Sequence, residues 1–230
     1  MEPDWQVLVA PAGVDPAFRG TGALAALYAP PRTPWLRANM VSTLNGVAAG
    51  PDGRSGSINN AIDREVFALL RAQADAIVVG AGTARTEGYR PTDKPLIVLS
   101  RSGALPPSLR NAPSGSVVVA TRSTAQKLVE TRDLLADDNV WVLGADDVDL
   151  ALLRSRLVGN GLRNILCEGG PTLLAGMLES GVVDEICLTW VPRMLGGEMQ
   201  PLLTGAPIDL TLKLQMLLER NGTLLGRWLI

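Results

Sequence analysis

The chain has 230 residues, a formal net charge of −2 and 47% hydrophobic residues, which is typical of a single large α/β domain. It contains no histidine, which excludes Ser-His-Asp and Cys-His hydrolase sites and the HExxH zinc site. Its two cysteines, Cys167 and Cys187, lie in apolar runs, so we expect buried reduced thiols and no metal site. The absence of a basic run predicts no nucleic-acid partner, and no apolar run reaches the ~18 residues that span a bilayer. Because the N-terminus also lacks the basic start of a signal peptide, we expect a cytoplasmic protein without a membrane partner.

Residues 1–34 are rich in alanine, proline and glycine, with a short helical stretch near Thr21–Tyr28. We interpret them as an arm packed on a single domain that spans residues 1–230. From Trp35 onward, continuous apolar runs alternate with helix-forming stretches. The runs predict strands at 35–42, 76–80, 95–100, 116–121, 140–144, 163–168 and 184–191. Helices are predicted near 61–73, 123–135, 149–158 and 172–180.

The tail, residues 210–230, carries Asn221-Gly222 between two strand-like runs, which is a strong signal for a β-hairpin. Strands alternating with helices predict an α/β fold whose mainly parallel sheet is covered by helices on both faces. The terminal hairpin adds antiparallel strands, so the predicted sheet is mixed.

The turn "GAGTART", residues 80–86, follows the strand at 76–80. Gly80 and Gly82 would let the backbone approach a phosphate at the start of a helix, although a plain strand–helix turn explains them equally well. Arg85 stands where the third glycine of a GxGxxG fingerprint would fall, so this is not a Rossmann motif. Ser100 and Arg101 follow the next strand, where a hydroxyl and an arginine favour the 2′-phosphate of NADPH. An exposed loop arginine is the alternative, and Arg122 lies in a similar turn.

The stretch "ILCEGGPTLLAG", residues 165–176, places a carboxylate and two glycines where a strand turns into a helix. Gly169, Gly170, Pro171 and Thr172 predict a second anion-binding turn, so one diphosphate could lie between two helix N-termini. Glu168 would repel a phosphate, and we expect it to point toward a ligand rich in N–H or O–H donors. The alternative is a solvent-facing glutamate at a strand end.

The loop 46–57 is rich in glycine and carries Ser55, and its length is typical of a mobile lid. It follows Asn45, and it precedes Asn60 and Asp63, whose spacing is that of a helix cap.

Four segments together resemble the reductase domain of bacterial riboflavin biosynthesis, which has the dihydrofolate reductase-like α/β/α fold. They are "MVSTLNG" (40–46), "SINNAIDREVFALLRAQADAIVVGAGTARTEGY" (57–89), "LCEGGPTLLAGMLESGVVDE" (166–185) and "PRMLGG" (192–197). The family's usual companion, a zinc deaminase domain, needs histidine and a cysteine pair, so the chain looks like a stand-alone reductase. The resemblance implies that NADPH reduces the ribosyl group of a phosphorylated aminopyrimidine at its C1, and it also implies a homodimer.

Carried over residue by residue, the resemblance assigns roles to positions of this sequence. Cofactor contacts fall on Val41, Ser42, Gly80, Gly82, Thr83, Glu87, Ser100, Arg101, Gly169, Gly170, Pro171, Thr172 and Leu173. Substrate contacts fall on Ser55, Arg71 and Glu168, and Glu168 is also a catalytic candidate together with Asn45. Asn45 stands where the family usually has aspartate, and the segment after Glu87 departs from "DDPxLT.R". Arg85, Arg90 and Lys94 are basic substitutes there for the substrate phosphate.

Two other functions stay open from the sequence. In a pteridine or dihydrofolate reductase, Asp63 would be the helix-borne acid that pairs with the ring and would bind substrate. A nucleotide-binding protein that has lost the reductase activity is the third possibility, favoured by Asn45. For assembly, we expect a two-fold homodimer formed by the apolar C-terminal strands, which would present an exposed sheet edge.

Overall fold

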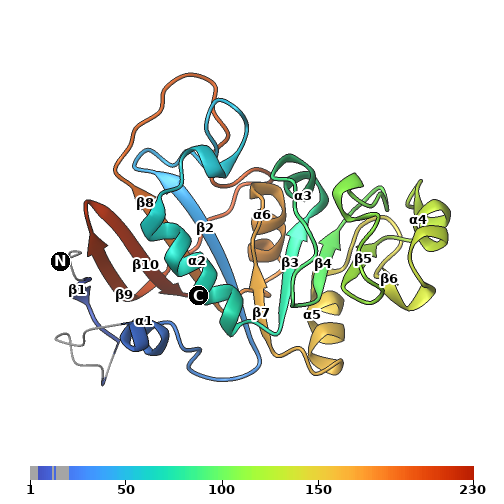
Figure 1. The fold of residues 1–230 in the computed structure, drawn as a ribbon, viewed down its shortest axis with the longest axis horizontal. Helices are drawn as coiled ribbons and strands as arrows, with labels where there is room; N and C mark the ends of the chain where they lie inside the picture. The colour runs from blue at the N-terminus through green and yellow to red at the C-terminus, as the bar shows by residue number, and fades with distance from the viewer. Residues whose placement is uncertain (1–4, 12, 14–20) are drawn as a thin grey trace.

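The computed structural model describes residues 5–11, 13 and 21–230. Within this part of the chain one ten-stranded sheet runs through the molecule, from β1 at one edge to β6 at the other (Figure 1). The strand order is β1-β9-β10-β8-β2-β7-β3-β4-β5-β6. The strands are β1 (Gln6–Val9), β2 (Trp35–Thr43), β3 (Ala76–Gly80), β4 (Leu96–Leu99), β5 (Val117–Thr121), β6 (Val140–Val142), β7 (Asn164–Cys167), β8 (Glu185–Val191), β9 (Lys213–Arg220) and β10 (Thr223–Leu229).

The strands from β8 to β6 are parallel, and β10, β9 and β1 add antiparallel pairs. The helices are α1 (Thr21–Leu27), α2 (Ala61–Gln73), α3 (Ala81–Thr86), α4 (Leu128–Leu134), α5 (Leu150–Gly159) and α6 (Pro171–Glu179). Three short 3₁₀ turns are η1 (Ser55–Ser57), η2 (Pro107–Leu109) and η3 (Asp137–Asn139). The predicted mixed, mainly parallel sheet and the predicted hairpin at Asn221-Gly222 are confirmed.

Helices cover both faces of the sheet, because the central strands are apolar on both sides. On one face, α1 and α2 pack through Leu27 and Leu70 against strand residues such as Leu218. On the other face, α5 and α6 pack through Leu157 and Met177 and the other residues of a second cluster. The three layers follow directly from continuous apolar strands such as β3, in which four of the five residues are buried. None of the helices that the structure describes combines the length and apolarity needed to cross a bilayer.

The expectation of an exposed edge on the C-terminal strands is wrong. β8 pairs with both β2 and β10, and β9 lies between β10 and β1. The first segment of the chain therefore supplies a strand, which the composition of residues 1–34 did not predict because β1 has only four residues. The edges of the sheet are β1 and β6.

The helix predicted at 123–135 is also shorter in the structure, where α4 begins at Leu128. The backbone N–H groups of Ser123 and Thr124 donate instead to the carbonyls of Gly144 and Ala145, at 2.9 and 3.4 Å. This pairing holds the preceding residues as a turn against the loop that follows β6.

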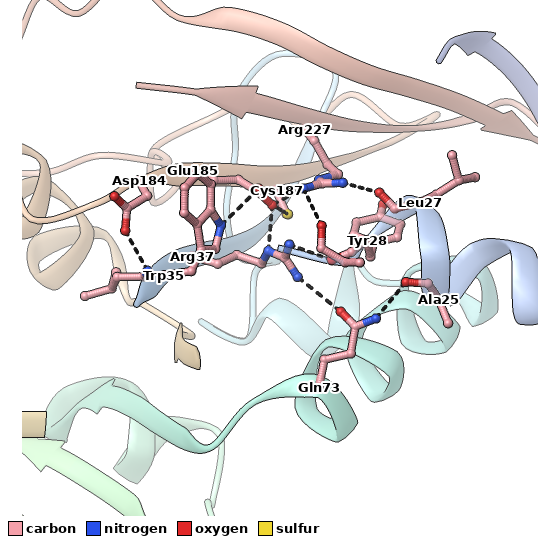
Figure 2. A network of polar contacts seen from close by, with 12 residues as sticks. Ala25, Leu27, Tyr28, Trp35, Arg37, Gln73, Asp184, Glu185, Cys187 and Arg227 are labelled. Carbon is pink, nitrogen blue, oxygen red and sulfur yellow. Dashed lines mark hydrogen bonds and ion pairs between the residues drawn. The ribbon is translucent and has the colours of Figure 1, made fainter. Parts of the chain in front are cut away.

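A buried ionic network ties α1 to the amino-terminal end of the parallel strands (Figure 2). Arg37 in β2 and Arg227 in β10 both donate to the carboxylate of Glu185, at 2.6 and 2.7 Å. The same two guanidinium groups donate to the carbonyls of Tyr28 and Leu27 at the C-terminal end of α1. Cations at this end of a helix satisfy its free carbonyls, so the network anchors α1 to the sheet. Both cysteines are free and buried, as expected.

Candidate active site

A cavity of about 1230 Å³ lies along the carboxyl edge of the parallel strands, where α/β proteins bind ligands. Most of the residues predicted to bind a ligand line it, although they come from distant parts of the chain. These residues are Val41, Ser55, Asp63, Arg71, Gly80, Gly82, Thr83, Glu87, Ser100, Arg101, Glu168, Gly170, Pro171, Thr172 and Leu173. Ser42, Gly169 and Asn45 are not among the lining residues.

The two predicted glycine turns meet in this cavity, because β3 and β7 are neighbours in the sheet. The N–H of Gly80 donates to the carbonyl of Gly169 at 2.8 Å. A Cβ at Gly170 would lie 2.4 Å from the Thr83 hydroxyl, so only glycine lets the second turn approach the first so closely. Gly169 has φ +76°, and a Cβ there would lie 2.7 Å from the sulfur of Met40.

Helix α6 begins at this junction with Pro171 in its first turn. Its N-cap is Gly170, which has no side chain to cap the helix, so the first backbone N–H groups are left for another acceptor. The Thr172 hydroxyl contacts Thr204 at 2.9 Å. The arrangement has the chemistry of an anion site: free N–H groups and the positive end of a helix.

Glu168 lies directly after β7 and is 7% exposed, which rules out the solvent-facing alternative. Arg71, in the last turn of α2, donates Nε to Oε1 and Nη2 to Oε2, both at 2.7 Å. The hydroxyl of Tyr89 donates to Oε2 at 2.6 Å. Burial, then the charge of Glu168, raise the pKa of Tyr89 well above its usual value of 10, so the phenol stays protonated. Burial lowers the pKa of Arg71, but its hydrogen bond and ion pair with Glu168 raise it overall.

Tyr89 is a site residue that the sequence did not predict. It is the last residue of the resembling segment 57–89, just after α3, where the sequence begins to depart from the family pattern. Gly88, with φ +68°, ends that helix and lets the chain turn back so that the N–H of Tyr89 donates to the carbonyl of Ala84 at 2.9 Å. A glycine followed by an aromatic residue at a helix end is the local signal that could have indicated it.

Asp63 provides a second carboxylate in the cavity, from the first turn of α2. The predicted cap is confirmed, because Asn60 Oδ1 accepts the N–H groups of Ile62 and Asp63, both at 3.0 Å. Asp63 itself is 3% exposed, and Thr189 is its polar neighbour. Its Oδ1 atom has no hydrogen-bond partner among the described residues. Burial raises the pKa of Asp63, against the opposing effect of Thr189.

Residues 46–57, predicted as a lid, are joined to the rest of the cavity wall by hydrogen bonds. The backbone N–H of Ser55 donates to Glu87 Oε1 at 2.6 Å, so Glu87 connects α3 to this loop. Arg193 donates to the carbonyl of Ser57 at 2.6 Å.

Arg101 and Arg122 lie in very different surroundings. Arg101 lines the cavity, and its side chain has no hydrogen-bond or ion-pair partner in residues 5–11, 13 and 21–230. Arg122 donates to the carbonyls of Arg101 and Asp146, at 2.9 and 2.5 Å. The Ser100 hydroxyl is buried and donates to the carbonyl of Ala104 at 3.0 Å.

Two predicted site residues have partners outside the cavity. The Ser42 hydroxyl donates to the carbonyl of Thr43 at 3.0 Å. The amide of Asn45 donates to the carbonyl of Leu195 at 2.7 Å and accepts from the hydroxyl of Thr43 at 2.8 Å. The structure therefore brings Asn45 against the segment after β8, and not against Glu168.

The layered α/β fold, with its cavity at the carboxyl edge of the parallel strands, agrees with the dihydrofolate reductase-like class of fold that the sequence predicted. The family model described as the RibD C-terminal domain matches residues 34–223. The chain belongs to this family.

Similar proteins support both the fold and the family. The 2,5-diamino-6-ribosylamino-4(3H)-pyrimidinone 5′-phosphate reductase of Methanothermobacter thermautotrophicus is 32% identical over 205 residues, which cover 83% of this chain and 94% of the relative. A pyrimidine reductase-like protein from Corynebacterium diphtheriae has a TM-score of 0.75 and 30% identity, covering 85% of this chain and 91% of that one.

A third similar protein, from Thermotoga maritima, shares the fold. It is described as a diaminohydroxyphosphoribosylaminopyrimidine deaminase/5-amino-6-(5-phosphoribosylamino)uracil reductase, with a TM-score of 0.65 and 18% identity. The match covers 86% of this chain but 56% of that one, so the chain spans about half its length.

Proposed function

We propose that the chain is an NADPH-dependent reductase that converts the ribosyl group of a phosphoribosylaminopyrimidine to a ribityl chain. The observation that carries this proposal is the position of Glu168, buried inside the cavity and directly before the glycine turn that begins α6. The proposal agrees with the pyrimidine substrates in the names of the similar proteins.

The residues of the cavity fit NADPH. The backbone N–H groups of Gly170, Thr172 and Leu173 at the start of α6 would hold the diphosphate together with the turn at Thr83. Arg101 would bind the 2′-phosphate, because its guanidinium has no other partner among the described residues. Val41 lines the cavity and would lie on the nicotinamide side. When bound, NADPH supplies the hydride for the reduction.

The protein's own part is to bind and orient the substrate and to exclude water. We infer that Glu168, fixed in place by Arg71 and Tyr89, presents a carboxylate of defined orientation to the sugar hydroxyls. Of the three basic candidates for the substrate phosphate, Arg85 and Arg90 line the cavity and Lys94 does not, so we assign the phosphate to the two arginines. Asn45 would have a structural role in this scheme.

Steady-state turnover tests the proposal and separates it from both alternatives. Purified protein is given NADPH with an aminopyrimidine ribosyl phosphate or with dihydrofolate, and the loss of absorbance at the nicotinamide band is followed. We expect oxidation with the pyrimidine only, and a ribityl product by mass spectrometry. Turnover of dihydrofolate alone would make the chain a folate-type reductase. NADPH binding without turnover of either substrate would make it a nucleotide-binding protein.

We further propose a homodimer formed by one face, not an edge, of the C-terminal strands. The face opposite α1 and α2 carries apolar side chains on β8, β9 and β10, including Leu214, Leu224 and a perpendicular pair of rings, Trp190 and Trp228, with centroids 4.9 Å apart. Leu214 is 38% exposed. Trp190, Leu224 and Trp228 are half-buried in the single chain. A partly exposed apolar surface of this kind is typical of an interface between subunits.

Sedimentation velocity at micromolar concentration tests the dimer. Leu214→Arg should shift the protein toward monomer, because it places a charge on the proposed interface. Leu152→Arg is the matched control, since Leu152 is 47% exposed but lies on α5. A monomeric wild type would refute the dimer. The cytoplasmic location stays a prediction that cell fractionation can test.

A further inference from the structure

The carboxylate of Glu168 has most of its hydrogen-bonding capacity filled by the protein. Arg71 donates Nε to Oε1 and Nη2 to Oε2, and the Tyr89 hydroxyl donates to Oε2 at 2.6 Å. Each carboxylate oxygen can accept about two hydrogen bonds, so Oε2 is filled and Oε1 can accept one more. The Glu168 side chain is only 2% exposed. This carboxylate alone can therefore accept one hydrogen bond from a substrate, and not the two that adjacent sugar hydroxyls would donate.

The phenol of Tyr89 offers a second acceptor beside Glu168. Tyr89 is half-buried and lines the cavity. Among the described residues its hydroxyl makes one hydrogen bond, the one that it donates to Glu168, and accepts none. Because the O–H bond points toward the carboxylate, the lone pairs of the phenol oxygen are left for a ligand. Donation to an anion polarises the hydroxyl and makes its oxygen a better acceptor.

Both acceptors are held in a defined orientation. The guanidinium of Arg71, which binds both oxygens of Glu168, lies over the rings of Phe67 and Tyr89. Its Cζ atom is 4.4 Å from the centroid of the Phe67 ring and 5.5 Å from that of the Tyr89 ring. Burial, then the charge of Glu168, raise the pKa of Tyr89, so its hydrogen bond to the carboxylate persists at neutral pH. Two fixed acceptors suit a ligand with two donors at a fixed spacing.

We propose that Tyr89 binds the substrate directly, and that its phenol oxygen and Oε1 of Glu168 each accept a hydrogen bond from one of the two adjacent hydroxyls, 2′ and 3′, of the ribosyl group. This inference rests on the proposed reductase function and adds a specificity-determining residue to it. A ribosyl group carries both hydroxyls on the same face of the ring, so it can donate to both acceptors at once. Tyr89 transfers no proton in this scheme and orients the sugar for reduction at C1.

Substrate analogues that lack one hydroxyl separate direct binding by Tyr89 from an effect through Glu168. Tyr89→Phe removes the phenol oxygen and leaves the two hydrogen bonds from Arg71 to Glu168 in place. With the ribosyl substrate the variant should lose roughly tenfold in affinity, the scale of one hydrogen bond to a buried acceptor. The loss should disappear with the analogue that lacks the hydroxyl bound by Tyr89, and it should persist with the other analogue.

Glu168→Gln should show the reverse pairing. The amide oxygen should occupy the position of Oε2, where Arg71 and Tyr89 both donate, so the amide nitrogen replaces Oε1 and removes the other acceptor. This variant should therefore be insensitive to the loss of the hydroxyl that Tyr89 does not bind. Tyr28→Phe is the matched control, because Tyr28 is the other tyrosine of the chain and is buried away from the cavity. It should leave all affinities unchanged.

Calorimetry in the presence of NADP⁺, which cannot donate a hydride, measures the affinities without turnover. The ligands are an aminopyrimidine ribosyl phosphate and its 2′-deoxy and 3′-deoxy analogues, and kcat/KM with NADPH is measured for the same pairs of protein and ligand. NADPH affinity, followed by fluorescence, reports whether each variant is folded. The wild-type comparison needs no variant to fold, and each deoxy analogue should bind the wild type roughly tenfold more weakly than the ribosyl compound.

The outcomes separate this inference from the function on which it rests. Crossed pairing, with each variant insensitive to the loss of a different hydroxyl, supports direct binding by Tyr89. If both variants respond to the same hydroxyl, or if Tyr89→Phe loses the same factor with all three ligands, Tyr89 acts only by holding Glu168 and the inference is overturned. Equal affinity of the wild type for the three ligands also overturns it. In each of these cases, turnover of the ribosyl compound by the wild type keeps the reductase function. Crossed pairing without turnover supports the sugar site and refutes the reductase, and binding of none of the ligands refutes both.

Discussion

Two buried Arg–Glu clusters of the described residues can be compared, because they lie at opposite ends of the parallel strands. At the amino-terminal end, Glu185 begins β8 and binds Arg37 and Arg227 (Figure 2). At the carboxyl end, Glu168 follows β7 and binds Arg71. The first cluster is enclosed by α1, and its arginines also bind backbone carbonyls of the same chain. The second lines the cavity, where the Arg71 side chain is 30% exposed.

Both clusters pair a glutamate with arginine, so their different roles come from their surroundings and not from the type of side chain. Every charged group of the Glu185 network has partners in the protein, so the network serves the fold. The Glu168 cluster is open to ligand on one side, and the cavity also holds polar groups with unfilled hydrogen-bonding capacity, such as Asp63 and Arg101. We therefore expect substitutions at the two ends to affect different quantities: stability at one end, and binding or turnover at the other.

The largest effect should come from Glu185→Gln. It leaves two buried guanidinium groups beside a neutral amide, and breaking a buried ion pair in this way typically costs about 3–5 kcal/mol. The free energy of unfolding, measured in urea, should fall by that amount. Glu130→Gln removes an exposed carboxylate that is paired with Lys127 and should leave stability nearly unchanged. Equal stabilities for the two variants would contradict an architectural role for the Glu185 network.

Glu168→Gln should affect turnover and not mainly the free energy of unfolding. The amide replaces one acceptor oxygen with a donor opposite Arg71 or the substrate, and kcat/KM should fall by roughly ten- to a hundredfold, or about 1.4–2.8 kcal/mol. NADPH affinity, measured by fluorescence, should change little, because the diphosphate contacts come from the backbone after Gly170. If NADPH binding weakens while kcat/KM at saturating cofactor is normal, Glu168 has been assigned to the wrong ligand.

A similar contrast exists between Arg101, after β4, and Arg122, after β5: only Arg122 has its guanidinium hydrogen-bonded to backbone carbonyls in the described part of the chain. Arg101→Ala should narrow the NADPH/NADH ratio of kcat/KM by roughly tenfold, the scale of one charge-assisted hydrogen bond. Arg122→Ala should lower stability without changing that ratio, since its guanidinium binds backbone carbonyls. Steady-state kinetics with NADPH and with NADH on both variants test this prediction. An unchanged NADPH/NADH ratio of kcat/KM in Arg101→Ala would show that Arg101 does not bind the 2′-phosphate.

Lowering the pH should change the contributions of Glu185 and Asp63 to the stability of the fold in opposite directions. Burial raises the pKa of Glu185, but Arg227 and Arg37 outweigh it, so the pKa lies below its usual 4.5. Its stabilising contribution is present above that pH and is lost as the pH falls through the folded-state pKa. The pKa of Asp63 is raised above 3.8, chiefly by burial, so its charge destabilises the fold above the folded-state pKa.

Asp63→Asn should consequently be more stable than the wild type near pH 7. The difference should shrink as the pH falls through the raised pKa and vanish below 3.8, where the unfolded chain is also protonated. Urea unfolding of both proteins over this pH range measures the sign of the difference between their free energies of unfolding. A variant less stable than the wild type at neutral pH would mean that Asp63 makes stabilising contacts that outweigh its burial.

Local patterns predicted much of this molecule. Continuous apolar runs located the parallel strands, and Asn221-Gly222 located the hairpin, because both signals lie within a few residues. Pairings across the fold could not be predicted in this way: Arg71 and Glu168 are 97 positions apart, and Arg37 and Glu185 are 148 apart. Tyr89 was missed because the surrounding segment departs from the family pattern, and β1 was missed because a four-residue edge strand has little periodicity.

A crystal structure of the protein with NADPH and an aminopyrimidine ribosyl phosphate is the most direct test of the proposed site. We expect the diphosphate at the start of α6, the 2′-phosphate at Arg101 and the sugar hydroxyls within hydrogen-bonding distance of Glu168, with the Glu185 network unchanged. Cofactor bound away from the Gly170 turn, or a substrate whose sugar does not reach Glu168, would contradict the proposed function.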